Sequence, residues 1–247
     1  MQTRRFVQTL HRWLGLALVA QIAIWMTSGV VMSFLPIELV RGETAAAYDA
    51  PVELAVKNYF PPGGVIAEME HADSVTLSNW LGRAVYVVST ADNKAMFDAD
   101  TGEKLSPLSE KDARRVAAAD FVGEGDIEKA DLLSNPPQEY RGAKPVWRIE
   151  FSDANETRIY VSPDTGAVVS RRNRIWRAYD FFWMLHIMDY DERENFNNPL
   201  IRTFATTGLL FALSGLFLVF VRLTGGRYAE DLRKAKRETG KSIEEQK

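Results

Sequence analysis

Cysteine is absent from the sequence. A disulfide framework and a thiolate metal site are therefore excluded, although an oxidising compartment remains permitted. The chain also lacks a glycine-rich phosphate loop, the pattern of a serine or cysteine triad, and a basic stripe of the kind that binds nucleic acid. These absences argue against the corresponding enzyme classes and against a nucleic-acid partner.

Charge is missing from two long runs. Trp13–Leu35 contains 23 consecutive uncharged residues, or about 35 Å of helix, and Thr203–Val221 contains 19, or about 28 Å. The hydrocarbon core of a bilayer is about 30 Å thick. We therefore predict two transmembrane helices, one within residues 1–37 and one at 200–223. The first run is too long for the apolar region of a signal peptide, which was the alternative reading.

The charges outside these runs are segregated. Residues 1–37 carry three arginines and no acid, and residues 203–247 carry a net charge of +3. The remaining residues, 38–202, carry 19 basic and 28 acidic side chains, a net charge of -9. This distribution follows the positive-inside rule, so we predict that both termini are cytoplasmic and that the middle forms a domain across the membrane.

The middle segment contains an internal repeat. The run Arg83–Val88 resembles Lys144–Ile149 at an offset of 61 residues, and Asp100-Thr101-Gly102 returns as Asp164-Thr165-Gly166 at an offset of 64. We predict two modules, 38–108 and 109–172, each a helix followed by a small antiparallel sheet. The elements expected in them are helices at 50–59 and at 110–119 (capped by Ser109), strands at 65–69 and 75–77, and a hairpin at 83–88 and 94–98.

The paired Asp-Thr-Gly sequences have other readings. Two such loops form the catalytic dyad of aspartic proteases, and the stretch from Asp98 to Ser109 loosely resembles a calcium-binding loop. Both sequences follow polar residues at points where a hairpin must turn, and Asp and Gly are ordinary turn residues. We therefore interpret both as turns.

Residues 173–199 are predicted to form an aromatic interfacial helix followed by an acidic loop, because Arg177 and Asp180 interrupt an otherwise apolar pattern. Residues 224–247 are predicted to be a charged cytoplasmic tail, either helical or disordered.

Three stretches carry a resemblance to a known family: Leu10–Gly15, the hairpin end Tyr160–Val168, and Leu185-His186. Together they resemble the bacterial PepSY-associated transmembrane (PepSY-TM) family over nearly the whole chain except the tail. The resemblance implies an inner-membrane protein with periplasmic PepSY modules. Several members act in membrane electron transfer, including the reduction of ferric siderophores, with haem held by histidines of the helix bundle. Isolated PepSY modules resemble the inhibitory pro-regions of secreted peptidases.

His11 and His186 are the candidate haem ligands that the resemblance points to, with Trp13 and Trp183 flanking the cofactor. Neutral imidazole is a common axial ligand of haem iron, although a histidine near the end of a span can also simply meet water or headgroups. One span separates the two histidines by about 30 Å, whereas two axial ligands of one iron are about 4 Å apart. One haem cannot take both, so we predict a two-fold homodimer in which each histidine pairs with its own mate.

The expectation is therefore a membrane α+β protein with two transmembrane helices flanking a tandem PepSY-like periplasmic domain. Its expected function is a haem b-binding component of electron transfer or iron acquisition, at most a reductase subunit. It would act in the lipid bilayer as a homodimer or with a membrane-complex partner. The alternative is a non-enzymatic anchored module that binds a peptide, a peptidase or a partner complex.

Overall fold

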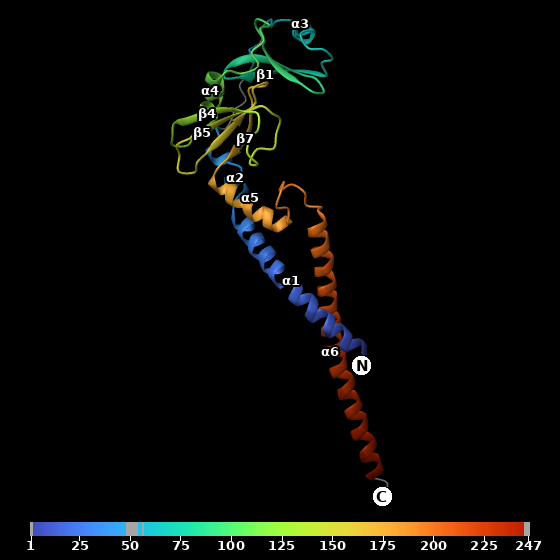
Figure 1. Cartoon of the computed structure of the whole chain (residues 1–247). Coiled ribbons are helices and arrows are strands. Elements are labelled where there is room, and N and C mark those ends of the chain that lie inside the picture. Colours follow the sequence, from blue (N-terminus) through green and yellow to red (C-terminus); the bar gives the residue numbers. More distant parts are fainter. Residues whose placement is uncertain (1, 48–53, 56, 245–247) are drawn as a thin grey trace. The chain divides into compact units, whose positions relative to one another are not determined.

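The structure is a computed structural model that describes residues 2–47, 54–55 and 57–244. The chain divides into two units (Figure 1). The helical unit consists of Met1–Val31 and Phe182–Lys247, and the sheet unit consists of Met32–Phe181. Each unit is described separately.

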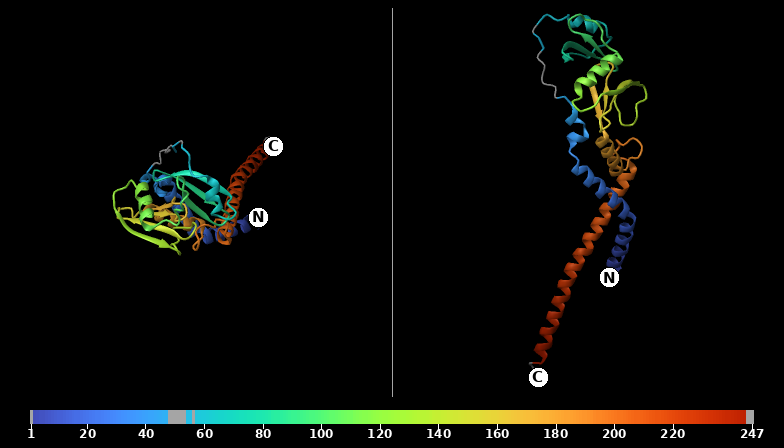
Figure 2. Two further views of the ribbon diagram at one scale, coloured as in Figure 1. Left: turned by 90° about the horizontal axis from the view of Figure 1, so that it is seen from above. Right: turned by 90° about the vertical axis from the view of Figure 1, so that its left-hand side faces the viewer.

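Two long helices dominate the helical unit. Helix α1 spans Gln2–Phe34 and helix α6 spans Pro199–Glu244, and the end of helix α5 (Arg174–Ile187) also belongs to this unit. Gln2–Phe34 and Pro199–Gly225 are long and apolar enough to cross a membrane, which agrees with the two predicted spans. Figures 1 and 2 show α1 and α6 crossing along the first half of α1. The helix of the second span continues through most of the predicted tail.

The sheet unit contains two antiparallel sheets and several short helices. The first sheet has the order β1-β2-β3, and the second has the order β4-β5-β6-β7. The remaining bounds are α2 (Ile37–Val40), η1 (Glu43–Ala45), α3 (Pro62–Ala67), β1 (Ser74–Trp80), β2 (Arg83–Ser89), β3 (Lys94–Asp98), α4 (Glu110–Asp120), β4 (Ile127–Leu133), β5 (Val146–Phe151), β6 (Arg158–Val161) and β7 (Val168–Arg172).

Alternating side chains on the strands build the cores of this unit. On β2, Val85 belongs to a core shared by both sheets and α4, whereas Tyr86 and Val88 belong to a second core on the other face of the first sheet. On β6, Ile159 joins the shared core and Tyr160 packs with Tyr140 on the opposite face. The two sheets thus share one core and each has a separate outer layer.

Two buried tryptophans of the sheets donate hydrogen bonds to backbone carbonyls that are distant in sequence. Trp80 Nε1 donates to Gly166 O at 3.3 Å, and Trp147 Nε1 donates to Leu108 O at 3.0 Å. A Cβ at Gly166 would lie 2.4 Å from Trp80 Nε1, so this position excludes a side chain as well as requiring φ +66°. Trp80 therefore joins the first sheet to the β6–β7 turn, and Trp147 joins the second sheet to the segment that precedes α4.

The two Asp-Thr-Gly sequences are hairpin turns, as predicted. In the first, Asp98 Oδ1 accepts from the amides of Asp100 and Thr101 at 2.7 and 3.0 Å, and Gly102 has φ +78°. In the second, the Ser162 hydroxyl accepts from the amides of Asp164 and Thr165, both at 3.3 Å. Side-chain to backbone bonds of this kind are ordinary turn chemistry.

Several further elements test the prediction from sequence. Strand β1, the β2–β3 hairpin and helix α4 are confirmed, and the amide of Asp112 donates to the Ser109 hydroxyl at 3.2 Å, which caps α4 as expected. The strand predicted at 65–69 is wrong, because Pro61 and Pro62 start helix α3 there. The helix predicted at 50–59 lies largely outside the described residues, and residues 57–59 are not helical. Strand β4 was not predicted, since charged residues obscure its alternation.

Candidate functional site

His11 lies on α1 and contacts α6. Its imidazole stacks on the Phe211 ring with centroids 4.2 Å apart and planes within 5°. Its Nδ1 atom lies 2.7 Å from Ser214 Oγ and 3.2 Å from Phe211 O. Gly15 and Gly215 permit this approach: a Cβ at Gly15 would lie 2.9 Å from the Phe211 ring, and one at Gly215 would lie 3.1 Å from His11 Cε1. The histidine therefore joins the two spanning helices.

His186, near the end of α5, makes the corresponding contact with α1. Its Nδ1 atom lies 3.0 Å from Ser28 Oγ, and Ser28 is 1% exposed. The neighbouring Gly29 would place a Cβ 3.6 Å from His186 Cε1. Each histidine thus sits against a Ser-Gly pair of another helix, Ser214-Gly215 for His11 and Ser28-Gly29 for His186.

The serine hydroxyls determine which ring nitrogen carries the proton. Ser214 donates to Phe211 O at 2.7 Å, and Ser28 donates to Ile24 O at 2.8 Å. With its proton directed to that carbonyl, each hydroxyl oxygen is free to accept from its imidazole, and on this basis we assign the proton to Nδ1 of His11 and of His186. Nε2 of both rings makes no hydrogen bond with the described residues. A histidine that donates from one nitrogen and leaves the other open has the form of a metal ligand.

The two histidine sites lie at different levels of the helical unit. Ser28, the partner of His186, lies 17 residues after His11 on α1, which corresponds to about 25 Å along the helix. This separation agrees with the prediction that the two imidazoles cannot ligate one iron.

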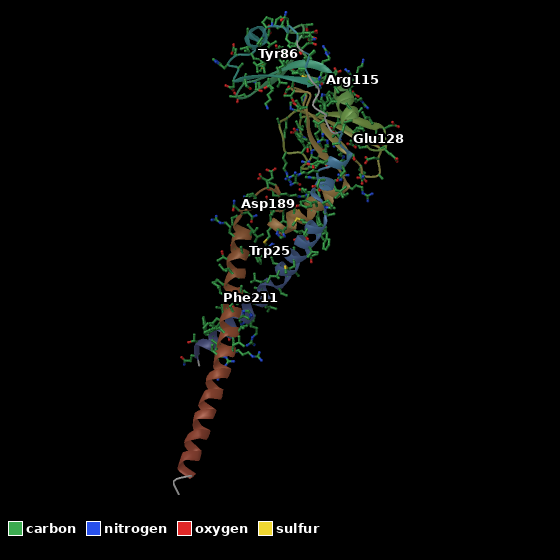
Figure 3. The ribbon with its side chains drawn as sticks, turned by 180° about the vertical axis from the view of Figure 1, so that it is seen from behind. Trp25, Tyr86, Arg115, Glu128, Asp189 and Phe211 are labelled. Atoms are coloured by element: carbon green, nitrogen blue, oxygen red, sulfur yellow. The ribbon has the colours of Figure 1, made fainter. Side chains whose placement is uncertain are left out.

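Two further polar groups on α1 lie between these levels. Gln21 is 7% exposed, and its Nε2 atom has no hydrogen-bond partner among the described residues. The same holds for Nε1 of Trp25, four residues further along the helix (Figure 3). A buried N–H without an acceptor is costly, and more so in a membrane. Polar groups therefore extend along one face of α1 from His11 to Ser28.

The two predicted flanking tryptophans occupy different surroundings. Trp13 is 65% exposed and lines an open groove with Arg12, Leu16 and Val19. It lies two residues after His11, about 200° around the helix, so it points away from the His11 ring. Trp183 is half-buried and donates from Nε1 to Arg193 O at 3.1 Å. Their role beside a cofactor stays a prediction.

The side chains available as metal ligands can be compared with those that haem, the cofactor predicted from the sequence, requires. Among the described residues, no group of three or more His, Asp or Glu side chains converges on a metal site. A single imidazole with an open Nε2 at each level fits an axial ligand of haem, for which the porphyrin supplies the other donors. Each level within one chain holds one such imidazole.

The sheet unit contains a buried charge network with a different character. The Glu139 carboxylate accepts from Tyr160 at 2.7 Å and from Arg158 at 2.9 Å, and Arg177 lies 3.6 Å away. Burial acts to raise the pKa of Glu139, but these hydrogen bonds and charges outweigh burial and hold it below its ordinary value. Burial and the hydrogen bond to Glu139 raise the pKa of the Tyr160 phenol. Each side chain of this network has at least one charged or hydrogen-bonding partner, although Nη1 of Arg177 makes no hydrogen bond with the described residues. Such pairing is typical of a structural role.

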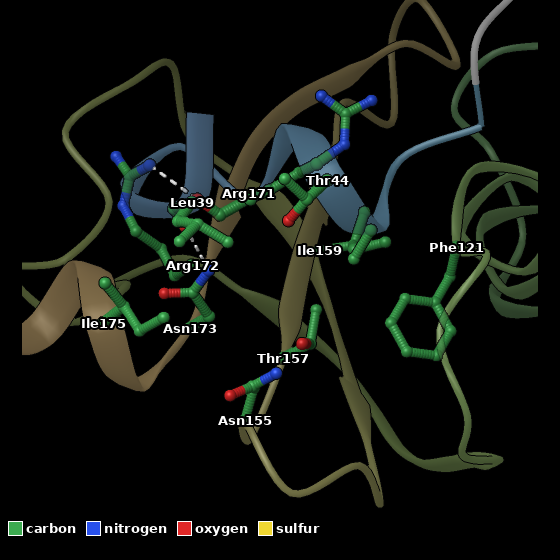
Figure 4. Close-up of a pocket in the computed structure, with 12 residues that line it drawn as sticks. Leu39, Thr44, Phe121, Asn155, Thr157, Ile159, Arg171, Arg172, Asn173 and Ile175 are labelled. Carbon is green, nitrogen blue, oxygen red and sulfur yellow. Dashed lines mark hydrogen bonds between the residues drawn. The ribbon is translucent and has the colours of Figure 1, made fainter. Parts of the chain in front are cut away.

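Residues where the predicted aromatic helix begins line a small cavity of about 40 Å³ (Figure 4). Asn173 donates to Leu39 O at 2.9 Å and accepts from the Trp176 amide at 2.7 Å, so it caps α5 and holds α2. Arg171 is engaged by the Asp120 carboxylate beside the cavity. The cavity has room for water but not for a substrate.

Two spans and an α+β domain with two antiparallel sheets define a membrane protein. The family model for the PepSY-associated TM region matches residues 8–242. The chain therefore belongs to the PepSY-associated transmembrane family, as its sequence motifs indicated. No curated protein and no solved structure matches it.

The Ser-Gly pairs were not predicted as partners of the histidines. The sequence analysis singled out the histidines, but Ser214 is 203 residues from His11 and Ser28 is 158 residues from His186. One signal was present: each spanning run contains one Ser-Gly pair, and small residues in such runs mark positions where helices approach closely.

Proposed function

We propose that this chain is a haem b-binding component of membrane electron transfer or of ferric-siderophore reduction. The observation that supports the proposal is the equivalence of the two histidines. Both place Nδ1 within hydrogen-bond distance of a serine of another helix, and Nε2 of neither ring makes a hydrogen bond with the described residues. His11 lies on a helix long and apolar enough to span a membrane, where ionisable residues are rare and usually functional, and His186 lies on α5 against the same helix.

A second copy of the chain would complete each site. Each level of one chain holds one imidazole, so a second axial imidazole must come from another molecule. A two-fold dimer would bring His11 to its own mate and His186 to its own mate, with one haem near each face of the membrane. We place both termini in the cytoplasm of an inner membrane and the sheet unit in the periplasm, on the charge distribution given above.

When bound, haem would supply one-electron transfer. The residues of this chain would hold and orient it. Ser28 and Ser214 fix the proton on Nδ1, and such outer partners raise the basicity of the ligating nitrogen. Trp13, Trp25 and Trp183 would flank the cofactor or anchor the helices at the interface.

The test is the visible absorption spectrum of the protein purified in mild detergent from haem-replete cells, before and after dithionite. We expect a Soret band and sharp α and β bands on reduction, lost in the His11→Ala/His186→Ala variant. His71→Ala is the matched control, because His71 is exposed in a turn of the sheet unit. A colourless wild-type preparation overturns the proposal. A monomer that retains stoichiometric haem overturns the dimer.

A second candidate function is an anchored, non-enzymatic module that binds a partner in the periplasm. Two open grooves of the sheet unit favour it. They measure about 690 and about 500 Å³ and share the turn 90–94 as a border. Clefts of this size are typical of ligand sites.

A further inference from the structure

The smaller of these grooves runs beside strand β7, and we call it the β7 groove. It is bordered by Val169, Ser170 and Arg172 of β7, by the loop 140–145, and by the turns 90–94 and 162–165. Because β7 is the last strand in the order β4-β5-β6-β7, one of its backbone edges has no strand partner in this sheet. An unpaired edge is a template for an added strand.

The β7 edge is irregular where the groove passes it. Val168 pairs with Val161 and Ser170 pairs with Tyr160, so Val169 is an extra residue in a bulge. Val169 is 46% exposed. It offers an apolar contact beside backbone groups, which is the combination that strand addition uses for affinity and specificity.

Arg172 gives the groove a fixed positive charge. Its Nε atom donates to Glu139 O at 2.6 Å and its Nη1 atom to Arg171 O at 2.9 Å, and its guanidinium lies 4.1 Å from the centre of the Trp176 ring. It forms no ion pair with a described carboxylate, and burial lowers its pKa. A half-buried guanidinium held by carbonyls and an aromatic ring is oriented, and Arg172 remains without a direct ion pair among the described residues.

Positive charges also predominate in the rest of the groove lining. Lys94 and Lys144 line the groove, are exposed, and form no ion pair with the described residues. Arg141 also lines it but pairs with Asp180 at 3.3 Å. The groove thus has more cations than its two carboxylates, Asp92 and Asp164, within a segment of net negative charge. Its charge is complementary to an anionic ligand.

We propose that the β7 groove binds an extended acidic peptide segment of a partner protein, which adds as a strand to β7 and places carboxylates near Lys94, Lys144 and Arg172. A groove of about 500 Å³ accommodates a few residues of such a segment. This inference rests on the second candidate function and is independent of the histidine sites.

The experiment uses the full chain in detergent micelles and a fluorescein-labelled peptide of alternating valine and aspartate, followed by fluorescence anisotropy. We expect saturable binding that weakens as salt rises from about 50 to about 500 mM. A valine–lysine peptide should bind about tenfold more weakly or not at all. The same peptide N-methylated at alternate residues should also lose binding, because it keeps its charge but cannot pair with the β7 edge.

Variants locate the binding. Lys94→Glu/Lys144→Glu should weaken binding of the acidic peptide about tenfold, because the two substitutions reverse the charge of the groove. Both lysines are exposed, so the substitutions should not disturb the fold. Lys111→Glu is the matched control, because Lys111 is exposed on α4 and does not line the groove. Equal loss in the control would overturn the assignment of the site.

The remaining outcomes separate this inference from the function on which it rests. Equal binding of the N-methylated peptide, or full displacement by inorganic phosphate or by phosphatidylglycerol vesicles, would show that the groove is a general anion site. Either result would overturn the proposal that an acidic peptide adds as a strand to β7. Preferential binding of the valine–lysine peptide would support the anchored module but overturn the acidic ligand. Absence of binding by every peptide would overturn both.

Discussion

The two units of the chain treat their buried polar groups differently. In the sheet unit, Glu139 receives hydrogen bonds from Tyr160 and Arg158 and lies close to Arg177. In the helical unit, His11 and His186 each use one ring nitrogen and leave the other open, and Gln21 has an amide nitrogen without a described acceptor. The sheet unit also has nitrogens without a hydrogen bond, Arg148 Nε and Arg177 Nη1, but both arginines pair with carboxylates. Paired networks stabilise a fold, whereas open polar groups in a membrane are sites where a ligand or a partner can bind. The buried polar groups of the sheet unit therefore stabilise its fold, whereas those of the helical unit include the proposed ligands.

The largest effect is expected when Glu139, the centre of the paired network in the sheet unit, is replaced. Glu139→Gln should lower the free energy of unfolding by about 2 kcal/mol at neutral pH, because it removes the buried carboxylate that accepts from Arg158 and Tyr160. Glu150 at 3.8 Å from Arg158 and Glu156 at 2.9 Å from Arg177 remain as weaker compensation. Chemical unfolding in detergent, followed by tryptophan fluorescence, measures the change. Glu128→Gln is the control, since Glu128 is exposed on β4 (Figure 3). A loss no larger than in the control would show that the network is not structural.

Low pH should remove the difference in stability between the wild type and the Glu139→Gln variant. The pKa of Glu139 in the folded protein lies below its ordinary value, so the stability it confers is fully present above the unfolded pKa of about 4.3. That stability is lost as the pH falls through the folded pKa. We therefore expect the gap between wild type and Glu139→Gln to be full at pH 7 and to shrink below about pH 4. A gap that is independent of pH would contradict the assigned charge state.

The serine partners of the histidines should show smaller effects on folding and clear effects on ligation. Ser28→Ala and Ser214→Ala should each cost about 1 kcal/mol, the range measured for hydrogen bonds between helices in membranes. Each should also weaken haem binding about tenfold, because the Nδ1 proton loses its acceptor. Thermal unfolding and haem titration measure the two effects, with Thr27→Val on the exposed face of α1 as control. Unchanged haem affinity would remove the serines from the proposed site.

The smallest expected effect on stability is that of Gln21→Leu, and its direction is informative. Gln21→Leu replaces a buried amide that lacks an acceptor, so it should leave the stability of the helical unit unchanged or raise it by about 1 kcal/mol. The same replacement at a paired group of the sheet unit would destabilise. Thermal unfolding of the detergent-solubilised protein decides. A clear loss of stability would mean that Gln21 has a partner in the assembled protein.

The sequence predicted the parts of the fold that local physics determines. Span length follows from charge-free runs, the cap of α4 from Ser109, and the turns from two Asp-Thr-Gly sequences. Helix α3 was misread because its short apolar run has no period long enough to separate helix from strand.

The candidate site was predictable only in part. The resemblance to the PepSY-associated transmembrane family pointed to His11 and His186 as candidate ligands, and their positions near membrane spans agreed with it. Sequence reasoning did not find that the Ser-Gly pairs are the partners of these histidines, and it left Glu139 without a role. These contacts join residues far apart in the chain, and a single sequence carries no signal for which distant helices or strands meet.

The most direct measurement is the ratio of haem to protein chain, taken from the reduced spectrum of four proteins. For paired imidazoles in a dimer, we expect about one haem per chain in wild type and about half of that in His11→Ala and in His186→Ala. His71→Ala should match wild type. A wild type without haem, or a His71→Ala variant that loses as much as the other two, would contradict the assignment of the open histidines as ligands.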